Sequence, residues 1–399
     1  MNHHYTLQQS VRWLLIALTI GLSACSVPTR QPAVPQTLSA KAEVVGLPGV
    51  RYVVQAEMPE ITQEAMDNIH KERAYLATQG VDTLPAANFL ALSGGGDDGA
   101  FGAGLLCGWT ASGTRPEFKL VTGISTGALL APFAFLGPKY DTALRAVYTE
   151  TTPKDILEAR AFHAAVFDDA MADNAPLGRL VAKYVTADML KEIAEEYAKG
   201  RLLLMATTNL DARQAVIWNM TKIAASGHPE ALKIFHKIML ASAAIPGAFP
   251  PAMIDVEVNG QRYQEMHVDG GAMAQVFVYP PSLKLAERAK GQGIVRERHL
   301  YVVRNARLDS DWAEVQRQTF SIAGRAISSL IQTQGVGDLY KIYTTAQRDG
   351  IDYNLAYIPK SFNAPHKEDF DSAYMRKLFQ TGYDLAVKGY RWDKTPPGF

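Results

Sequence analysis

Short apolar runs of strand length recur along the chain and alternate with longer stretches that have helical periodicity. The runs are rich in Leu, Val and Ile, as expected of strands that are buried on both faces of a sheet. They stand at residues 88–93, 120–121, 201–208, 214–219, 300–304 and 353–358. The alternation predicts an α/β fold, in which the runs at 201–208 and 214–219 pair as neighbouring strands.

Helical periodicity is clearest in two segments. Residues 59–80 carry apolar positions among charges and end at a glycine that suits the end of a helix. Residues 140–199 are charged and mostly helical in pattern, and we expect them to form an insertion over or beside the sheet. Further helices are expected at residues 228–241, 312–346 and 368–390. No Pro/Gly/Ser-rich linker separates residues 291–399 from residues 86–290, so we expect both parts to form one domain.

The first 24 residues differ from the rest of the chain. A single charge, Arg12, precedes the apolar run at residues 13–20. This run is far shorter than the roughly 20 residues that a membrane-spanning helix needs. The pattern predicts a secretory signal peptide over residues 1–24. The residues Leu22-Ser-Ala-Cys25 resemble the lipobox of bacterial lipoproteins, and the alternative is an ordinary signal peptide followed by an incidental cysteine.

The lipobox resemblance implies cleavage before Cys25, lipidation of this residue and attachment to a membrane of the bacterial cell envelope. Ser26 stands where an inner-membrane retention signal usually has Asp, so the resemblance favours the outer membrane. Residues 26–50 contain several prolines and predict an extended tether. Residues 25–85 would then comprise the lipidated cysteine, the tether and the N-terminal helical segment.

Composition narrows the classes of function. The chain of 399 residues contains 40 Lys and Arg against 40 Asp and Glu. Nothing therefore indicates the electrostatic footprint of a nucleic-acid-binding protein. Two cysteines cannot build a disulfide framework, and Cys107 stands in an apolar, Gly-rich run where we expect a small buried residue.

A serine stands between a strand-like run and a helix-like run in the segment Gly123-Ile-Ser-Thr-Gly127. Gly-x-Ser-x-Gly in this setting is the pattern of a nucleophile elbow, in which two glycines permit a sharp turn that exposes the hydroxyl. Ser125 is therefore a candidate nucleophile. The alternative is a tight strand–helix connection in which Ser125 only caps the helix.

A Gly-rich loop, Gly94-Gly-Gly-Asp-Asp-Gly99, follows the apolar run at residues 88–93. Backbone N–H groups between a strand and a helix can bind an anion. A dinucleotide fingerprint would need an acidic residue at the end of the next strand, and a P-loop would need Gly-Lys-Ser/Thr; neither is present. An oxyanion hole fits best, because adjacent parallel strands place their carboxyl-end loops side by side. We expect Asp97 and Asp98 to cap the following helix, with their carboxylates turned away from the oxyanion.

A serine nucleophile also needs a proton acceptor. The histidine candidates are His228, His236, His267, His299 and His366. None of them stands in an obvious catalytic motif, although His267 and Asp269 would share one face of a strand. Asp269 is followed by Gly270 and Gly271, which would let the carboxylate project from the strand end and accept the serine proton directly. The alternative for this triplet is an ordinary β-turn.

Four blocks, in this order, resemble the patatin-like phospholipase family over about residues 88–285. They are the Gly-rich loop, the serine segment, the segment Ala241-Ser-Ala-Ala-Ile-Pro-Gly-Ala-Phe-Pro250, and Asp269-Gly-Gly271. The resemblance implies a three-layer α/β/α sandwich with a mainly parallel central sheet. It also implies a Ser-Asp dyad without histidine, and hydrolysis of fatty-acyl esters, usually of phospholipids.

Carried over by position, the resemblance makes Ser125 the nucleophile and Asp269 the general base, with the N–H groups of Gly94, Gly95 and Gly96 as the oxyanion hole. The remaining glycines that the motifs mark are Gly99, Gly123, Gly127, Gly270 and Gly271. Asp98 departs from the family, which often has Arg or Lys at that position, so head-group preference is open.

These observations predict a membrane-tethered serine acyl hydrolase, with membrane lipids as substrate and anchor. No metal or other cofactor is required by this chemistry, no nucleic acid is expected as a partner, and the sequence does not define protein partners. The alternatives are an esterase of the Ser-His-Asp α/β-hydrolase type and a non-catalytic lipid-binding protein of the cell envelope.

Overall fold

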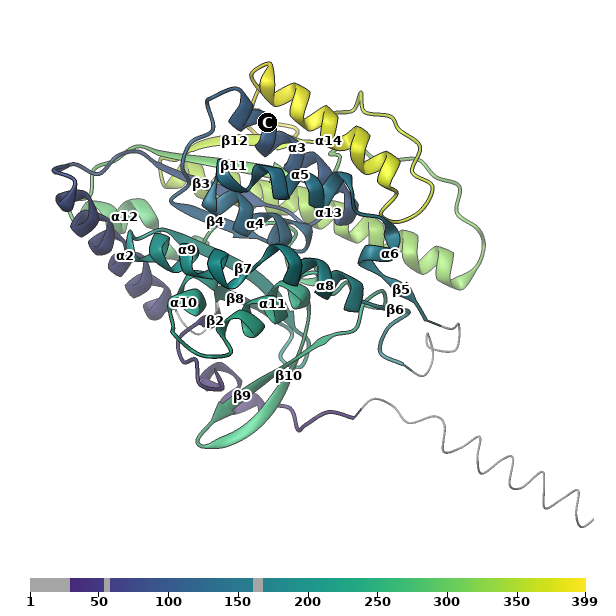
Figure 1. Cartoon of the computed structure of the whole chain (residues 1–399), viewed down its shortest axis with the longest axis horizontal. Helices are drawn as coiled ribbons and strands as arrows, with labels where there is room; N and C mark the ends of the chain where they lie inside the picture. The colour runs from purple at the N-terminus through teal and green to yellow at the C-terminus, as the bar shows by residue number, and fades with distance from the viewer. Residues whose placement is uncertain (1–28, 54–57, 161–167) are drawn as a thin grey trace, which may run out of the picture.

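A ten-stranded sheet forms the centre of the molecule and lies between layers of helices (Figure 1). The computed structural model describes residues 29–53, 58–160 and 168–399. The strands of the sheet are β1 (Glu43–Val44), β2 (Arg51–Val53), β3 (Ala87–Leu92), β4 (Leu120–Gly123), β7 (Leu202–Asn209), β8 (Gln214–Asn219), β9 (Ala252–Val258), β10 (Gln261–Asp269), β11 (Arg298–Arg304) and β12 (Asp352–Tyr357). A separate small sheet pairs β5 (Glu158–Ala159) with β6 (Ala172–Asp173).

The centre of the large sheet is parallel. Strands β7, β4, β3, β11 and β12 follow one another as parallel neighbours. Antiparallel strands extend the sheet from β7: β8 and β2 lie along one edge, and β10, β9 and β1 continue from the other. The expected α/β class with a parallel centre is confirmed. Because β11 and β12 belong to this sheet, residues of the C-terminal part pack in the hydrophobic clusters on both of its faces.

Helices cover both faces of the sheet. The face with the larger core carries α3 (Gly99–Ala111), α4 (Thr126–Leu136), α5 (Asp141–Thr149), α8 (Ala175–Tyr184), α9 (Ala187–Ala198), α11 (Ala231–Ser242) and α14 (Ser372–Val387). The opposite face carries α2 (Met58–Thr78), α12 (Leu285–Gly291) and α13 (Thr319–Arg348). Two short helices, α6 (Pro153–Ile156) and α10 (Met220–Ala224), complete the set in the described residues.

Most predicted elements are confirmed. The helix expected at residues 59–80 is α2, and Gly80 follows it with φ 71°, a left-handed conformation that suits glycine. The strands expected at 201–208 and 214–219 are β7 and β8, which pair antiparallel. The helices and strands expected after residue 220 appear as α11, β11, α13, β12 and α14.

The expected tether at residues 26–50 is only partly extended chain. A short 3-10 helix forms at Gln36–Lys41, and β1 then pairs with β9. Val44, Leu47 and Val50 are buried. These apolar residues stabilise the segment against the sheet edge, an effect that the prolines around them obscured in the sequence.

Strands β2, β5, β6 and β9 were not predicted. Strand β9 pairs with β10, the strand on which His267 and Asp269 were expected, and this hairpin extends away from the helices in Figure 1. The β5–β6 pair lies within the helical segment. The signal peptide and Cys25 lie outside the described residues. Among the helices that the structure describes, none is long and apolar enough to cross a membrane.

Candidate active site

Ser125 lies on a sharp turn between β4 and α4. It has φ 55° and ψ −127°, a strained conformation for a residue with a side chain, and only 6% of it is exposed. A Cβ atom added to Gly127 would lie 2.3 Å from the carbonyl oxygen of Leu92. One added to Gly123 would lie 2.4 Å from the carbonyl oxygen of Gly127. The two glycines are therefore required for the close packing of this turn, which has the form of a nucleophile elbow.

Asp269 ends β10, and the Ser125 side chain is near enough to its carboxyl group to lower the pKa of that carboxyl. Its Oδ1 also accepts a hydrogen bond from the Gly271 N–H at 2.7 Å. Burial raises the pKa of the Asp269 carboxyl to about 6, and the Ser125 side chain and the Gly271 N–H oppose part of this increase. The carboxylate thus has a pKa closer to neutrality than an exposed aspartate.

Strand β7 brings Ser125 and Asp269 together. Strand β4 runs parallel to the first half of β7 and ends where Gly123 pairs with Met205. Strand β10 approaches the second half of β7 antiparallel, and Asp269 pairs with Thr207. Both strands therefore end beside the middle of β7, although their last residues are far apart in sequence. A Cβ atom added to Gly270 would lie 2.5 Å from the Ala206 carbonyl oxygen, so this junction is tightly packed.

Ser242 holds the backbone of the elbow. Its Oγ accepts a hydrogen bond from the Ser125 N–H at 3.1 Å and donates one to the Ala206 carbonyl oxygen at 2.8 Å. Sequence reasoning did not assign a role to Ser242. The signal was present, because this serine begins the Ser-Ala-x-x-Pro part of the third family-like block.

The Gly-rich loop lies against the elbow. A Cβ atom added to Gly94 would lie 3.2 Å from the Ser125 Cβ, and one added to Gly99 would lie 2.1 Å from the Thr126 Oγ1. The Gly94 N–H, however, donates to the Gln275 carbonyl oxygen at 3.0 Å. The expectation that Gly94 supplies an oxyanion donor is therefore wrong for this conformation. Within the described residues the N–H groups of Gly95 and Gly96 donate to no acceptor, so they remain candidates.

Asn305 fixes the position of the Gly-rich loop. Its N–H donates to the Ser93 Oγ at 2.8 Å, its Nδ2 donates to the Ser93 carbonyl oxygen at 2.9 Å, and its Oδ1 accepts from the Gly102 N–H at 3.1 Å. A Cβ atom added to Gly95 would lie 1.9 Å from the Asn305 carbonyl oxygen. Only glycine therefore fits at position 95, and the loop is held from β11 as well as from its own strand.

A buried cation, Arg304, lies beneath the same loop. Its Nη1 lies 3.3 Å from the Ser93 Oγ and 3.4 Å from the Gly94 carbonyl oxygen. Burial lowers the pKa of the guanidinium to about 10, while the carboxylates of Asp338 and Asp98 act in the opposite direction. Within the described residues no carboxylate forms an ion pair with Arg304. Position 98 holds an aspartate where the family often has a basic residue. In this chain the basic group near the Gly-rich loop is instead Arg304, the last residue of β11.

Asp97 and Asp98 do not cap α3, so this expectation is wrong. The Asp97 Oδ2 accepts hydrogen bonds from the His366 Nε2 at 2.7 Å and the Phe370 N–H at 2.9 Å. The Asp98 Oδ1 accepts one from the Tyr374 hydroxyl at 2.6 Å, and burial raises the pKa of this carboxyl to about 6. Both carboxylates connect the Gly-rich loop to the chain segment around the start of α14.

None of the candidate histidines hydrogen-bonds Ser125 in the part of the chain that the structure describes. His267 is fully buried, with its Nδ1 2.8 Å from the Thr207 Oγ1 and its Nε2 3.0 Å from the Glu265 Oε2. Burial lowers the pKa of the imidazole, although Glu265 acts in the opposite direction. The other candidates contact groups away from the elbow, namely Glu230 for His228, Val185 for His236, Asp352 for His299 and Asp97 for His366.

No three His, Cys, Asp or Glu side chains of the described residues gather as metal ligands would. Cys107 is a free, buried cysteine, as expected from its apolar surroundings. Burial raises the pKa of its thiol to about 12, which makes it a poor nucleophile.

An α/β sheet that carries a serine elbow beside a Gly-rich loop defines the class of protein, that of the serine acyl hydrolases. The family model "Patatin-like phospholipase" matches residues 90–280. This match confirms the resemblance inferred from the sequence for this region of the chain.

Solved structures give a looser likeness. The chain shares 12% sequence identity with VipD from Legionella pneumophila, whose crystal structure matches with a TM-score of 0.33. The match covers 76% of this chain and 66% of the VipD chain. A chain in the structure of full-length SpcU with full-length ExoU from the type III secretion system of Pseudomonas aeruginosa shares 11% sequence identity, with a TM-score of 0.29. The match covers 77% of this chain and 52% of that chain. The match thus spans less than two thirds of the length of either. Among curated proteins, no sequence matches this chain.

Proposed function

We propose that this protein is a serine acyl hydrolase that cleaves fatty-acyl esters of lipids, phospholipids among them. The observation that carries the proposal is the convergence of the Ser125 elbow and the buried Asp269 carboxyl beside the middle of β7, within the region that the patatin-like family model matches. Ser125 is the nucleophile and Asp269 the general base. The Ser-His-Asp alternative has less support, because no candidate histidine contacts Ser125 in the described structure.

The reaction has two steps. Ser125 Oγ attacks the ester carbonyl while its proton passes to Asp269, and the tetrahedral intermediate collapses as Asp269 returns the proton to the leaving alcohol. Water then hydrolyses the acyl-enzyme, with Asp269 again as the base. The oxyanion binds to the N–H groups of Gly95 and Gly96. One such donor typically contributes about 10²–10³-fold to the rate, and the Arg304 cation beneath the loop adds a favourable field.

An aspartate is suited to this role only because it is buried. A base works best when its pKa lies near the working pH, and an ordinary carboxylate is too acidic to accept a serine proton efficiently. Burial raises the pKa of Asp269 to about 6, which brings it towards that range.

The pH dependence of kcat/KM should report this group. Asp269 is a base only when ionised, so kcat/KM should fall about tenfold per pH unit well below pH 6 and level off above about pH 7. A soluble short-chain ester measured from pH 4.5 to 8.5 provides the profile.

Asp98 is the control for that profile, because burial also raises its pKa to about 6. The Asp98→Asn variant should retain the acidic limb, since Asp98 is placed away from the reacting atoms. Loss of the limb in this variant would assign the titration to Asp98 and contradict the role of Asp269.

We also propose that Cys25 carries a lipid anchor, which would place the site beside its lipid substrate. The support is the residue pattern at Leu22–Cys25. The Cys25→Ala variant, expressed in a bacterium, should move from the membrane fraction to the soluble fraction, and the native chain should incorporate a labelled fatty acid. An unlabelled chain that still cofractionates with membranes would exclude this anchor.

A further inference from the structure

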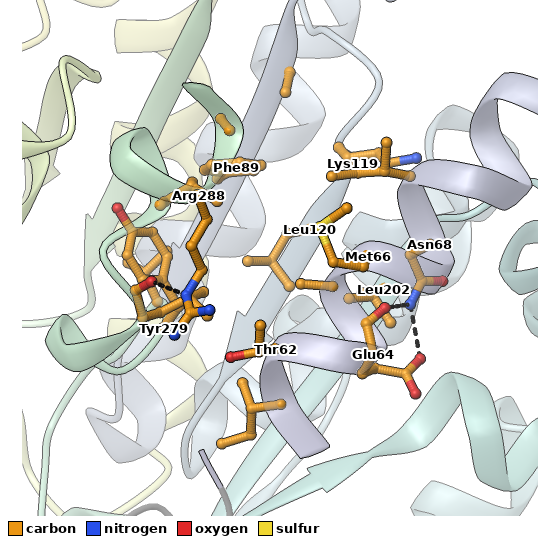
Figure 2. A pocket seen from close by; sticks show the side chains of 18 of the residues that line it. Thr62, Glu64, Met66, Asn68, Phe89, Lys119, Leu120, Leu202, Tyr279 and Arg288 are labelled. Carbon is orange, nitrogen blue, oxygen red and sulfur yellow. Dashed lines mark hydrogen bonds between the residues drawn. The ribbon is translucent and has the colours of Figure 1, made fainter. Parts of the chain in front are cut away.

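Two features outside the Ser125–Asp269 pair differ in their charge balance. The small apolar cavity beneath α2, about 140 Å³ in volume, is open, and Arg288 on its wall is exposed (Figure 2). The buried carboxylate on its other side, Glu64, pairs with Lys222 at 3.0 Å. Arg304, by contrast, is only 2% exposed and forms no ion pair within the described residues. This cation is therefore the feature that needs an explanation.

The burial of Arg304 is not compensated by its contacts. Its Nε has no hydrogen-bond partner in the part of the chain that the structure describes. The two hydrogen bonds of its Nη1 are long, 3.3 Å to the Ser93 Oγ and 3.4 Å to the Gly94 carbonyl oxygen. Removing a guanidinium group from water is costly, and apolar side chains often replace buried charges without loss of stability. Stability alone therefore does not account for Arg304.

Helix α13 makes room for the guanidinium group at Gly335. A Cβ atom added to Gly335 would lie 2.5 Å from the Arg304 Nη2 and 2.7 Å from its Cζ. Glycine is less favourable than alanine inside a helix, so α13 loses some stability at the position where the cation packs. A Cβ atom added to Gly337, two residues further on, would meet no atom within 4 Å.

Both polar backbone groups of Gly94 are engaged. Its N–H donates to the Gln275 carbonyl oxygen at 3.0 Å. Its carbonyl oxygen accepts hydrogen bonds from the Ser93 Oγ at 2.7 Å and from the Arg304 Nη1. The peptide unit that joins Gly94 to Gly95 is therefore held in one orientation.

This orientation determines where the Gly95 N–H points. The peptide is trans, so its C=O and N–H groups point in opposite directions. The Gly94 C=O points to Arg304, and the Gly95 N–H consequently points away from the cation and donates to no acceptor in the described residues. A cation at the carbonyl oxygen polarises the peptide, which makes its N–H a stronger hydrogen-bond donor.

We propose that Arg304 is a positioning residue of the oxyanion hole: packed against Gly335, it orients and polarises the Gly94–Gly95 peptide so that the Gly95 N–H binds the oxyanion. This inference rests on the proposed role of Ser125 as the nucleophile. Arg304 acts through the peptide and does not touch the ester. Its effect should therefore appear in the transition state and not in the binding of the substrate.

The test compares Arg304→Met and Gly335→Ala in the full chain with a soluble short-chain ester. Arg304→Met removes the charge, and Gly335→Ala displaces the guanidinium group with a methyl group. Both should lower kcat by about 10- to 100-fold and leave KM unchanged. The matched control is Gly337→Ala, the same substitution on the same helix, which should retain the native kcat.

A trifluoromethyl ketone analogue of the ester provides a second readout. The Ser125 Oγ adds to its carbonyl carbon, the serine proton passes to Asp269, and the carbonyl oxygen becomes an oxyanion. The inhibition constant should increase in Arg304→Met and Gly335→Ala by the factor by which kcat/KM falls. A smaller folded fraction would lower kcat without changing this constant, so the readout separates positioning from a structural role.

Circular dichroism checks that each variant is folded, and Gly335→Ala decides the result if Arg304→Met does not fold. The inference is overturned if either folded variant retains the native kcat, if the loss appears in KM, or if the inhibition constant does not change. A native protein that neither hydrolyses the ester nor binds the ketone would overturn the proposed function, and this inference with it.

Discussion

Replacing Ser125 with alanine should lower ester hydrolysis by about 10⁴-fold or more, because the attacking oxygen is lost and no neighbouring group can take its place. The fold should survive. The substitution removes only the serine hydroxyl, and the hydrogen bond from the residue 125 N–H to the Ser242 Oγ remains available. Release of fatty acid from phospholipid vesicles measures the activity.

The matched control for this variant is Ser310→Ala, which removes a hydroxyl from an exposed loop position and should leave the rate unchanged. Urea unfolding of both variants separates a catalytic loss from an unfolded protein. A folded Ser125→Ala protein that hydrolyses vesicles at the native rate would exclude Ser125 as the nucleophile.

Asp269→Asn should lower hydrolysis by a similar factor, about 10⁴-fold, because an amide cannot accept the serine proton. The same substitution should increase the stability of the fold at neutral pH. Burial in the folded state raises the pKa of Asp269 to about 6, above its value in the unfolded chain. Between these two pKa values the folded chain binds a proton more tightly than the unfolded chain does, so the free energy of unfolding falls as the pH rises. At neutral pH the ionised carboxylate costs roughly 3 kcal/mol, which asparagine does not incur.

The expected result is therefore an inactive protein that resists urea at least as well as the native one at pH 7.5. The comparison variant is His366→Gln, which tests the most exposed histidine near the Gly-rich loop. If His366→Gln abolishes hydrolysis while Asp269→Asn remains active, the base is a histidine and the Ser-His-Asp alternative is correct.

Ser125 and Asp269 could be proposed as site residues from the sequence because glycines mark the turns on which they lie. Gly123 and Gly127 are required by contacts with backbone atoms, and Gly270 lies against the Ala206 carbonyl oxygen. Steric demands of this kind leave a local signal that can be recognised without knowledge of the fold. What local patterns could not show is that β7 accepts β4 along its first half and β10 along its second.

The residues that support the site were not predicted, because local patterns do not show contacts between segments that are distant in sequence. Ser242, Gln275 and Asn305 act on the site through contacts with residues that are distant in sequence. The Gly94 N–H was predicted to be an oxyanion donor, but it donates to the Gln275 carbonyl oxygen. Likewise, Asp97 and Asp98 stand where helix caps are common, yet their partners lie on the segment around the start of α14. Such roles depend on tertiary contacts that periodicity does not encode.

Covalent labelling with a fluorophosphonate probe tests the Ser125–Asp269 pair most directly. The probe reacts only with an activated serine, and mass spectrometry of the labelled peptides identifies the residue. We expect one label on Ser125 in the native protein, a rate of labelling that rises with pH through about 6, and strongly reduced labelling in folded Asp269→Asn. A folded native protein that is not labelled, or a label on another serine, would contradict it.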